Sequence, residues 1–444
     1  MIRWRVGVLG ILVSIALAAS GSPAPSFSEA DIRASRIVLY APGSLPEKPA
    51  DIFTGVDMLN LFIVVEAGAH HIAVFDGDKF ESVHRFKCRD ALQGEPQFTP
   101  DGRYVYVASR DGWITKFDIW NLKTITEIRA GTVIRNIAIS SDGKFLAVAN
   151  ELPHTLVLLD AELQLLMVHA AKSMDGKMRS GVSAVYDAAP RRSFVAALEN
   201  VPEIWEISYN PAAEELPVGM IHDFRYREGA FVPGFLNPRR TSLSEPIGDF
   251  ILTRDTNELL GARRGAGKAP VVNLDVRRVI AELNLPGQPH PGAGATWQWQ
   301  GKSVMAVPDF KDGPISLIDV ANWKPIMSMP TGPGLFVRSH EKTPYAWAGS
   351  VMRQSTGTLL VFDKRSQSPV TEITVSPGKT LAQVEFSRDA TYALASLAER
   401  NNDGGALVVF DAATFKEIKR ISMDKPTGAY NVFNSIRRSL VTLH

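Results

Sequence analysis

The sequence predicts an all-β fold, an eight-bladed β-propeller, because one short pattern repeats along most of the chain. In each copy an apolar, β-rich run ends on an acidic residue, a polar turn follows, and a second strand begins; residues 357–373 (GTLLVFDKRSQSPVTEI) are the clearest example. By subtraction, successive acidic positions are 42, 42, 46, 69, 44, 44 and 48 residues apart, against about 40–50 residues for a four-stranded propeller blade. These positions are Asp76, Asp118, Asp160, Glu206, Asp275, Asp319, Asp363 and Asp411.

Physical reasons support this interpretation of the spacing. A single four-stranded blade cannot bury both of its faces, so blades of similar length must cover one another and close in a ring. The apolar run suits a strand buried on both faces, and an aspartate suits the turn after it, because its carboxylate accepts hydrogen bonds from turn N–H groups. A second turn, residues 100–103 (PDGR), returns 41 residues later, by subtraction, as residues 141–144 (SDGK).

The composition fits one large ring and gives no support for nucleic-acid binding. The chain has 444 residues, of which 45% are hydrophobic, and eight blades use this length as one domain. Lysine and arginine number 48 against 47 acidic residues, a net charge of +1, without the basic excess of a nucleic-acid-binding domain. An electrostatic function would therefore depend on where individual arginines lie.

The N-terminus has the pattern of a cleaved export signal. Arg3 and Arg5 precede an apolar run at residues 6–19 that is short for a membrane span, and Ala18 ends a stretch of small residues suited to cleavage. We expect residues 1–19 to be a signal peptide, with an uncleaved anchor as the alternative. The only cysteine, Cys88, is distant from this segment, so no lipid-attachment motif is present. The expected product is periplasmic and has no membrane anchor.

The mature chain is expected to begin with a lead-in at residues 20–54, small and polar over 20–28, with a candidate strand at 36–40. The propeller follows over residues 55–434. Alternating or apolar runs bounded by turn residues predict its strands. The clearest pairs are residues 61–65 and 71–75 in blade one, 104–108 and 113–117 in blade two, and 193–197 and 203–207 in blade four.

One interval, from Glu206 to Asp275, is about 25 residues longer than a typical period. Its segment 226–240 is basic, aromatic and rich in turn formers. We expect such an insertion on one face of the propeller, often the binding face, with a solvated loop as the alternative. Blades five to eight are expected at residues 250–279, 303–326, 345–373 and 392–421. A short strand within 426–434 would pair near the N-terminus and close the ring, leaving residues 435–444 as a tail.

Residues with obvious catalytic or metal-binding patterns are sparse. The nine histidines show no metal-binding spacing, and the chain contains no Gly-x-Ser-x-Gly turn or phosphate-binding loop. His70 and His71 begin a strand and would point to opposite faces. His290 is the most suggestive, because the prolines and glycines of residues 287–294 (GQPHPGAG) fix its backbone between blades five and six. Such a link can reach the central channel; a solvent-facing turn histidine is the alternative.

Several segments outside the repeat resemble the haem d1 propeller, the eight-bladed domain of cytochrome cd1-type nitrite reductases and of their relatives in haem d1 biosynthesis. The resemblance covers roughly residues 55–434. The segment 226–240, which closes on Pro-Arg-Arg, is similar to the biosynthetic branch that includes dihydro-haem d1 dehydrogenase. The segments that carry the resemblance are residues 113–120, 289–292 (PHPG), 334–340 (GLFVRSH) and 426–434.

The resemblance implies that haem d1 or its dihydro precursor binds in the central channel, with a role in haem d1 maturation for denitrification. Haem d1 bears several carboxylates and oxo groups, and arginine suits such a ligand through charge-assisted hydrogen bonds. By position in the matching motifs, Arg110, Arg135 and Arg263 are candidate contacts, although each could instead pair with a neighbouring carboxylate. His290 corresponds to a histidine above the macrocycle, which makes it the candidate catalytic residue and a further cofactor contact.

Two departures from the family pattern leave the activity open. The c-type haem domain of the reductases is absent, and a lone cysteine excludes a Cys-x-x-Cys-His attachment, so electrons would need a separate carrier. The resemblance also places the iron's proximal histidine around Gln93 and Gly94, where residues 93–98 read QGEPQF and contain no histidine. Without that imidazole, tight iron ligation is in doubt, and the metal ligand stays unassigned, although His70, His71 or His84 could come near.

Three hypotheses follow. The chain is a periplasmic carrier or oxidoreductase acting on a haem d1 precursor, a haem-free interaction propeller, or a nitrite reductase-like subunit that depends on an external electron donor. The missing proximal histidine counts against the third hypothesis, and the His290 turn counts against the second. The expected partners are the tetrapyrrole and either a periplasmic cytochrome or other haem d1 assembly proteins.

Overall fold

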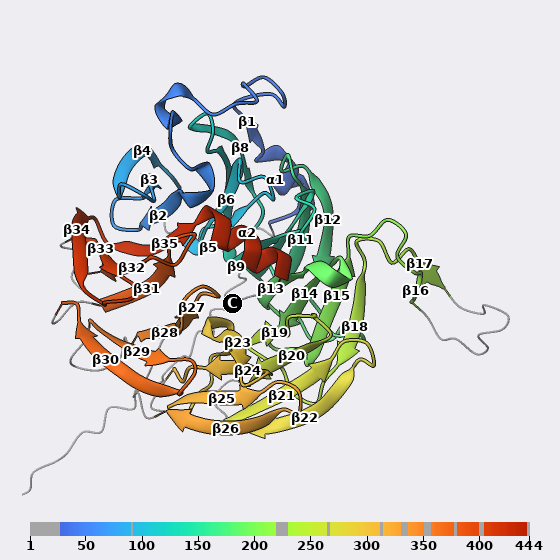
Figure 1. Ribbon diagram of the computed structural model, residues 1–444. Coiled ribbons are helices and arrows are strands. Elements are labelled where there is room, and N and C mark those ends of the chain that lie inside the picture. The colour runs from blue at the N-terminus through green and yellow to red at the C-terminus, as the bar shows by residue number, and fades with distance from the viewer. Residues whose placement is uncertain are drawn as a thin grey trace, which may run out of the picture.

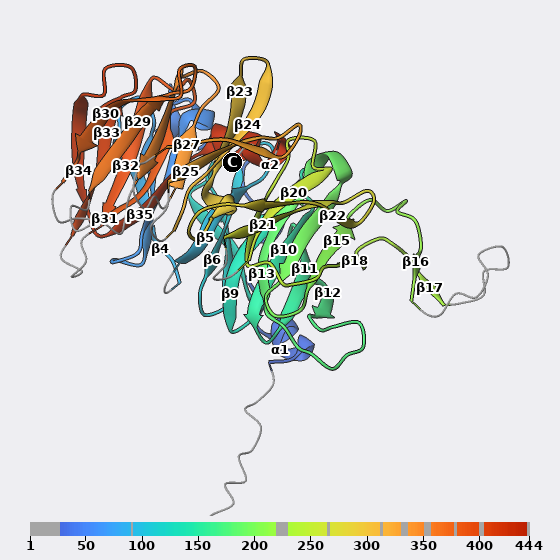
Figure 2. The same ribbon diagram turned by 90° about the horizontal axis from the view of Figure 1, so that it is seen from below.

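The computed structural model describes residues 27–89, 92–218, 230–263, 267–310, 314–329, 336–349, 357–376, 380–398 and 404–441. Eight antiparallel sheets stand around a central axis (Figure 1), which confirms the eight-bladed propeller expected from the spacing. A short additional pair, β16 (Leu216–Pro217) and β17 (Phe231–Val232), stands away from the ring (Figures 1 and 2). None of the helices within these ranges is long and apolar enough to span a membrane.

Each blade runs from an innermost strand to an outer edge. Blade one contains β35 (Pro426–Asn431), β2 (Phe62–Glu66), β3 (His71–Asp76) and β4 (Glu81–Lys87). Blade two contains β5 (Leu92–Phe98), β6 (Tyr104–Ser109), β7 (Trp113–Asp118), β8 (Lys123–Arg129) and, at its edge, β1 (Ile37–Val38). Blade three contains β9 (Val133–Ile139), β10 (Phe145–Leu152), β11 (Thr155–Asp160) and β12 (Leu165–Ala170). Blade four contains β13 (Val182–Ala188), β14 (Ser193–Leu198), β15 (Glu203–Ser208) and β18 (Pro238–Ser242).

The second half of the ring repeats the arrangement. Blade five contains β19 (Asp249–Leu252), β20 (Glu258–Ala262), β21 (Lys268–Asn273) and β22 (Arg278–Asn284). Blade six contains β23 (Ala295–Trp299), β24 (Lys302–Val307), β25 (Ile315–Asp319) and β26 (Lys324–Met329). Blade seven contains β27 (Phe336–Ser339), β28 (Tyr345–Gly349), β29 (Thr358–Asp363) and β30 (Ser368–Thr374). Blade eight contains β31 (Thr380–Phe386), β32 (Tyr392–Ala398), β33 (Gly405–Asp411) and β34 (Glu417–Met423).

The repeated aspartates end the third strand of most blades and cap the turn that follows. Asp118, for example, accepts a hydrogen bond from the N–H of Asn121 at 3.1 Å. Blade five differs, because Asn273 accepts from the N–H of Asp275 at 3.0 Å, so the asparagine rather than Asp275 caps the turn. Blade four has no such turn, and Glu206 lies inside β15. The capping chemistry therefore explains both the regular copies and the two irregular ones.

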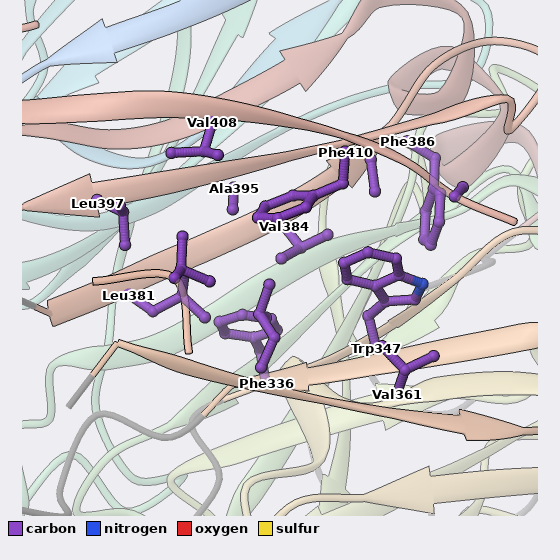
Figure 3. Packing of buried hydrophobic residues seen from close by; sticks show 14 of the residues in the cluster. Phe336, Trp347, Val361, Leu381, Val384, Phe386, Ala395, Leu397, Val408 and Phe410 are labelled. Carbon is purple, nitrogen blue, oxygen red and sulfur yellow. The ribbon is translucent and has the colours of Figure 1, made fainter. Parts of the chain in front are cut away.

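Packing between neighbouring blades forms the core. Figure 3 shows Phe336 and Trp347 of blade seven meeting Leu381, Phe386 and Phe410 of blade eight, all of them buried. The two sheets thus cover each other's apolar faces, as the repeat requires. Similar clusters lie between other pairs of blades.

The C-terminal strand closes the ring. Antiparallel β35 pairs with β2, with Tyr430 opposite Ile63, and so supplies the innermost strand of blade one from the far end of the chain. The expected tail is not a loose extension, because α2 (Val432–Val441) begins directly after this strand. It crosses one end of the ring (Figure 1) and contacts β5, β13 and two short 3-10 helices, η2 (Met58–Asn60) and η3 (Ala189–Arg191).

The antiparallel topology gives the ring two distinct faces. Links from a first to a second strand, and from a third to a fourth, lie on the face that α2 covers. Links from a second to a third strand, and from one blade to the next, lie on the opposite face. The long insertion proves to be internal to blade four, between β15 and β18, and not a connection between blades. Residues 219–229 of this segment lie outside the described ranges.

The N-terminal lead-in packs against the outside of the ring. Helix α1 (Glu29–Ala34) buries Ile32 against blades two and three, and the strand expected at residues 36–40 is present as β1, which pairs with β8. A 3-10 helix, η1 (Asp51–Phe53), precedes the first blade. Residues 1–19, which are expected to be a signal peptide, lie outside the described ranges.

Candidate functional site

A cavity of about 590 Å³ lies on the propeller axis, lined by inner strands and the links between blades. This volume is within the range of about 300–1,000 Å³ that is typical of small-molecule and cofactor sites. Its wall carries groups of both charges together with aromatic hydroxyls. They include Glu95, Asn136, Tyr186, His290, Arg338 and Tyr430.

The His290 link is held firmly against blade six. The backbone N–H of His290 donates to the carbonyl of Pro308 at 2.9 Å, and the imidazole ring meets Phe310 edge-on at 5.6 Å between centroids. The N–H of Gln288 donates to the carboxylate of Asp309. A Cβ at Gly287 would overlap that carboxylate, and Gly287 has a φ of +66°, so glycine is required there. The Pro-Gly composition of this turn thus fixes where the histidine stands.

Asp249 joins the His290 link to the wall of the cavity. Its Oδ2 lies 3.5 Å from Nε2 of His290 and accepts from the N–H of Gly292 at 2.8 Å. Its Oδ1 accepts from the hydroxyl of Tyr186 at 3.4 Å. Burial, reinforced by the charge of Asp249, raises the pKa of Tyr186 well above its usual value, so this hydroxyl keeps its proton at neutral pH. Asp249 therefore joins the imidazole, the turn that follows it and the Tyr186 hydroxyl into one connected group at the cavity wall.

An ion pair crosses the cavity between blades two and seven. Nη2 of Arg338 lies 3.1 Å from Oε1 of Glu95, although the two residues are 243 positions apart. Nearby Gln383 is 5% exposed and lines the same cavity, yet neither its amide nitrogen nor its amide oxygen has a partner among the described residues. A buried amide without partners is costly unless a ligand or solvent completes its hydrogen bonds. The cavity therefore offers a donor, an acceptor and a cation to a polar ligand.

Helix α2 supplies the floor of the cavity. Ser435 and Arg438 line it, and Nη2 of Arg438 lies 2.6 Å from Oε2 of Glu385 on the inner strand of blade eight. The hydroxyl of Tyr430 is buried, which raises its pKa and keeps the phenol neutral. The end of the axis opposite to His290 is therefore built from paired charges.

The three predicted arginines lie on the same face as His290, but none is among the described residues that line the cavity. Arg110 is exposed, and its carbonyl accepts from the N–H of Ile134, which brings it next to Arg135. Arg135 pairs with Glu151 at 3.1 Å and with Glu199 at 3.3 Å. Arg263 is buried and pairs with two other carboxylates, Glu245 at 3.3 Å and Glu282 at 2.9 Å. The assignment of these arginines to a tetrapyrrole stays a prediction.

The stretch expected to hold a proximal histidine, around Gln93 and Gly94, lies on β5, the innermost strand of blade two. The backbone of Gln93 is still paired with Ala108 of β6, and the register shifts directly after it. Gly94 has a φ of +76°, and Leu92 and Gly94 both line the cavity. The stretch in which the resemblance places the proximal histidine therefore does line the cavity, through Leu92 and residues 94–98.

The charged residue that this stretch contributes to the cavity is Glu95. His290 is the one histidine among the described lining residues. His84 lies on the outermost strand of blade one, stacked near Phe86, and residues 70–71 lie at the turn between β2 and β3. Within the described ranges, no group of three or more metal-ligating side chains gathers.

Sequence reasoning did not single out several residues of this cavity. Arg338 belongs to the segment 334–340, one of those that carry the family resemblance, and this membership could have identified it. Residues 330–335 are outside the described ranges. Asp249, Tyr186 and Gln383 belong to inner strands whose residues look like ordinary members of the repeat. Only the ring closure brings them together.

Comparison with known proteins agrees with this geometry. The chain is 43% identical, over 95% of its length and 80% of the relative, to a dihydro-heme d1 dehydrogenase of Pseudomonas aeruginosa. It is 24% identical, over 86% of its length and 72% of the relative, to a nitrite reductase of Stutzerimonas stutzeri. The solved structure titled dihydro-heme d1 dehydrogenase NirN in complex with DHE superposes with a TM-score of 0.84 at 43% identity, over 94% of this chain and 84% of that one.

The family model of the Cytochrome D1 heme domain matches residues 56–435, which span all eight blades and the start of α2. This match agrees with the resemblance noted over residues 55–434. The blades, the His290 link and the closing strand all fall within the matched residues, and the chain therefore belongs to the Cytochrome D1 heme domain family.

Proposed function

We propose that this chain is exported to the periplasm, binds dihydro-haem d1 in the axial cavity and oxidises it to haem d1. The observation that carries the proposal is the cavity itself, in which His290 stands beside Asp249 within a fold 43% identical to a relative solved with DHE. The cavity's unpartnered Gln383 amide and its arginine suit a ligand that bears carboxylates and oxo groups.

The chemistry of a dehydrogenation assigns a task to His290. Converting a dihydro compound to its parent removes two hydrogen atoms, so that one saturated bond becomes a double bond and two protons and two electrons leave. His290 accepts one proton, and the negative charge of Asp249 stabilises the imidazolium that results. The second proton passes to water, and the two electrons pass to a separate redox protein such as a periplasmic cytochrome.

A spectroscopic titration tests the proposal directly. The purified full chain is titrated with dihydro-haem d1 in the absence of oxygen, and a one-electron oxidant is then added. We expect a spectral change on binding, followed by conversion to the haem d1 spectrum only when both protein and oxidant are present. An unchanged spectrum throughout would favour the haem-free interaction propeller. A change on binding without conversion would favour a carrier.

The arginine contacts can be tested separately from catalysis. Arg338→Gln is expected to weaken binding of dihydro-haem d1, because Arg338 lines the cavity and a charge-assisted contact contributes on the order of 1–3 kcal/mol. Arg135→Ala and Arg110→Ala should weaken binding if the ligand extends beyond the cavity to these two arginines. Arg365→Ala is the matched control, because Arg365 lies on the outer part of blade seven and is largely exposed. If the control weakens binding as much as the others, the contacts are not specific.

Export is tested by fractionation. N-terminal sequencing of the periplasmic protein is expected to begin near Ser20, after cleavage at Ala18 or Ala19. Recovery of Met1 from a membrane fraction would show an uncleaved anchor instead.

A further inference from the structure

A second cavity, of about 380 Å³, opens at the end of the axis that α2 covers. Its wall combines α2 with the turns that follow the inner strands of blades five and seven, and with β23 of blade six. Arg338 and Arg438 line both this cavity and the axial one, and therefore stand between them.

Positive charge exceeds negative charge in this second cavity. Its two carboxylates are each engaged by an arginine of α2, Glu341 with Arg437 and Glu385 with Arg438. The excess comes from five basic lining residues, namely Arg254, Arg338, Lys364, Arg437 and Arg438. Since Arg338 pairs with Glu95 of the axial cavity, Lys364 and Arg254 are left without a carboxylate partner in the described part of the chain.

Lys364 is the most unusual of these cations. It is only 8% exposed, and its ammonium donates to one neutral acceptor, the carbonyl of His340 at 2.8 Å. An ammonium has three donors and is costly to bury without an anion. A structural role would require a carboxylate beside it, and the described residues provide none within ion-pair distance. An anion in the cavity would supply the missing charge.

The indole N–H of Trp297 is a second reason to expect an anionic ligand in this cavity. Trp297 lines the cavity, is 8% exposed, and its ring nitrogen has no acceptor among the described residues. Its ring, with Met305 and Val320, forms an apolar part of the wall. The cavity thus offers several cationic donors around an apolar surface. A volume of about 380 Å³ is also much larger than a single inorganic oxyanion needs.

We propose that this second cavity binds a small organic anion with two or more carboxylates, held by Lys364 and Arg254 against the Trp297 ring. Guanidinium groups bind planar carboxylates through paired hydrogen bonds, and the apolar wall accommodates a carbon skeleton. The proposal is independent of tetrapyrrole binding, because Lys364 and Trp297 line this cavity and not the axial one.

Isothermal titration calorimetry of the full chain with citrate as the probe tests the proposal. Citrate is expected to bind with one site per chain, and acetate at the same concentration is expected not to bind. Lys364→Gln should weaken citrate binding at least tenfold. The matched control is Lys177→Gln, at an exposed lysine in the link between blades three and four, which should leave the affinity unchanged.

A second variant keeps the test decisive if Lys364→Gln does not fold. Trp297→Phe retains the ring and removes only the N–H, and is expected to weaken citrate binding several-fold. His290→Ala, in the other cavity, should not change it. The proposal is overturned if the wild-type chain binds no citrate, if inorganic phosphate binds and citrate does not, or if Lys177→Gln weakens binding as much as Lys364→Gln.

Discussion

The role proposed for His290 depends on two neighbours that the sequence does not place beside it. The ring lies against Phe310, and Asp249 stands 3.5 Å from its Nε2. The sequence pointed to His290 because prolines and glycines fix a backbone locally. It could not point to Asp249, since an aspartate at the start of a repeat strand looks the same whether or not it faces the axis.

Replacing His290 with Gln is expected to slow oxidation of dihydro-haem d1 by about 10²–10⁴-fold, the usual contribution of a general base, while binding changes less than about fivefold. Anaerobic stopped-flow spectroscopy measures the rate, and equilibrium titration measures the affinity. As a second variant, Asp249→Asn keeps the imidazole but removes the adjacent carboxylate, and should also slow the oxidation, because the ring loses the negative charge 3.5 Å from its Nε2. Normal turnover in the glutamine variant would contradict the role of His290.

Lys364 makes the stability of the fold depend on pH. Burial lowers the pKa of its ammonium from 10.5 to about 8, although the negative charge of Asp363 opposes the shift. Between these two values the unfolded chain binds a proton that the folded chain has lost, so the free energy of unfolding rises with pH, by about 3 kcal/mol at most. Below pH 8 both states are protonated and this contribution is absent.

In the wild type the free energy of unfolding is expected to rise between pH 8 and pH 10.5, and Lys364→Met is expected to remove this rise. Urea unfolding at pH 7.5 and at pH 10 gives the difference between wild type and variant. Lys177→Met, at an exposed lysine, should follow the wild-type dependence. Identical pH profiles for the wild type and the Lys364 variant would show that this ammonium is not responsible.

The element that differs most from its sequence prediction is α2, because residues 435–444 were expected to be a tail. Its residues follow a strand without a glycine or proline break, and the run Val432–Val441 begins with a β-branched and an aromatic residue. The signal that was available is a cap: Oδ1 of Asn431, the last residue of β35, accepts from the N–H of Asn434 at 3.1 Å. Because Asn431 is both the last residue of the strand and the N-cap of the helix, no loop in the sequence marks where the helix begins.

Two neighbouring arginines of α2 are expected to differ sharply in their contribution to stability. Arg438 and its partner Glu385 are only 16% and 4% exposed, whereas Arg437 and Glu341 are 35% and 47% exposed. Arg438→Met leaves a buried carboxylate uncompensated and should cost about 3–5 kcal/mol. Arg437→Met should cost about 0–1 kcal/mol.

Denaturant unfolding measures both variants of α2. The double variant Glu385→Gln with Arg438→Met should recover part of the loss, because it no longer buries a lone charge. If the two single variants lose equal stability, the buried ion pair is not what holds α2 in place.

At the scale of the whole molecule, the period of the repeat was sufficient to predict the ring. Eight acidic positions gave the number of blades even though two of them, Glu206 and Asp275, do not cap turns as the others do. The axial cavity was not predictable in the same way. Glu95 and Arg338 meet only because the ring brings blades two and seven across the axis from each other.

Removing residues 426–444 is expected to open the ring. Blade one would lose its innermost strand, and β2 would present unpaired N–H and carbonyl groups. Circular dichroism and size-exclusion chromatography should show lost cooperativity on heating and aggregation. Adding a synthetic peptide of residues 426–441 should restore part of the folded signal. A monomeric truncated chain with unchanged unfolding would mean that β35 is dispensable.

The closing strand also determines when the ring can complete its folding. Tyr430 pairs with Ile63, a separation of 367 residues by subtraction, so the first blade stays incomplete until β35 has been synthesised. Contacts between residues so far apart form slowly, because the intervening chain must be ordered or its loop entropy overcome. A chain of this topology cannot close its ring before β35 has been made, and this delay would be compatible with the export proposed above.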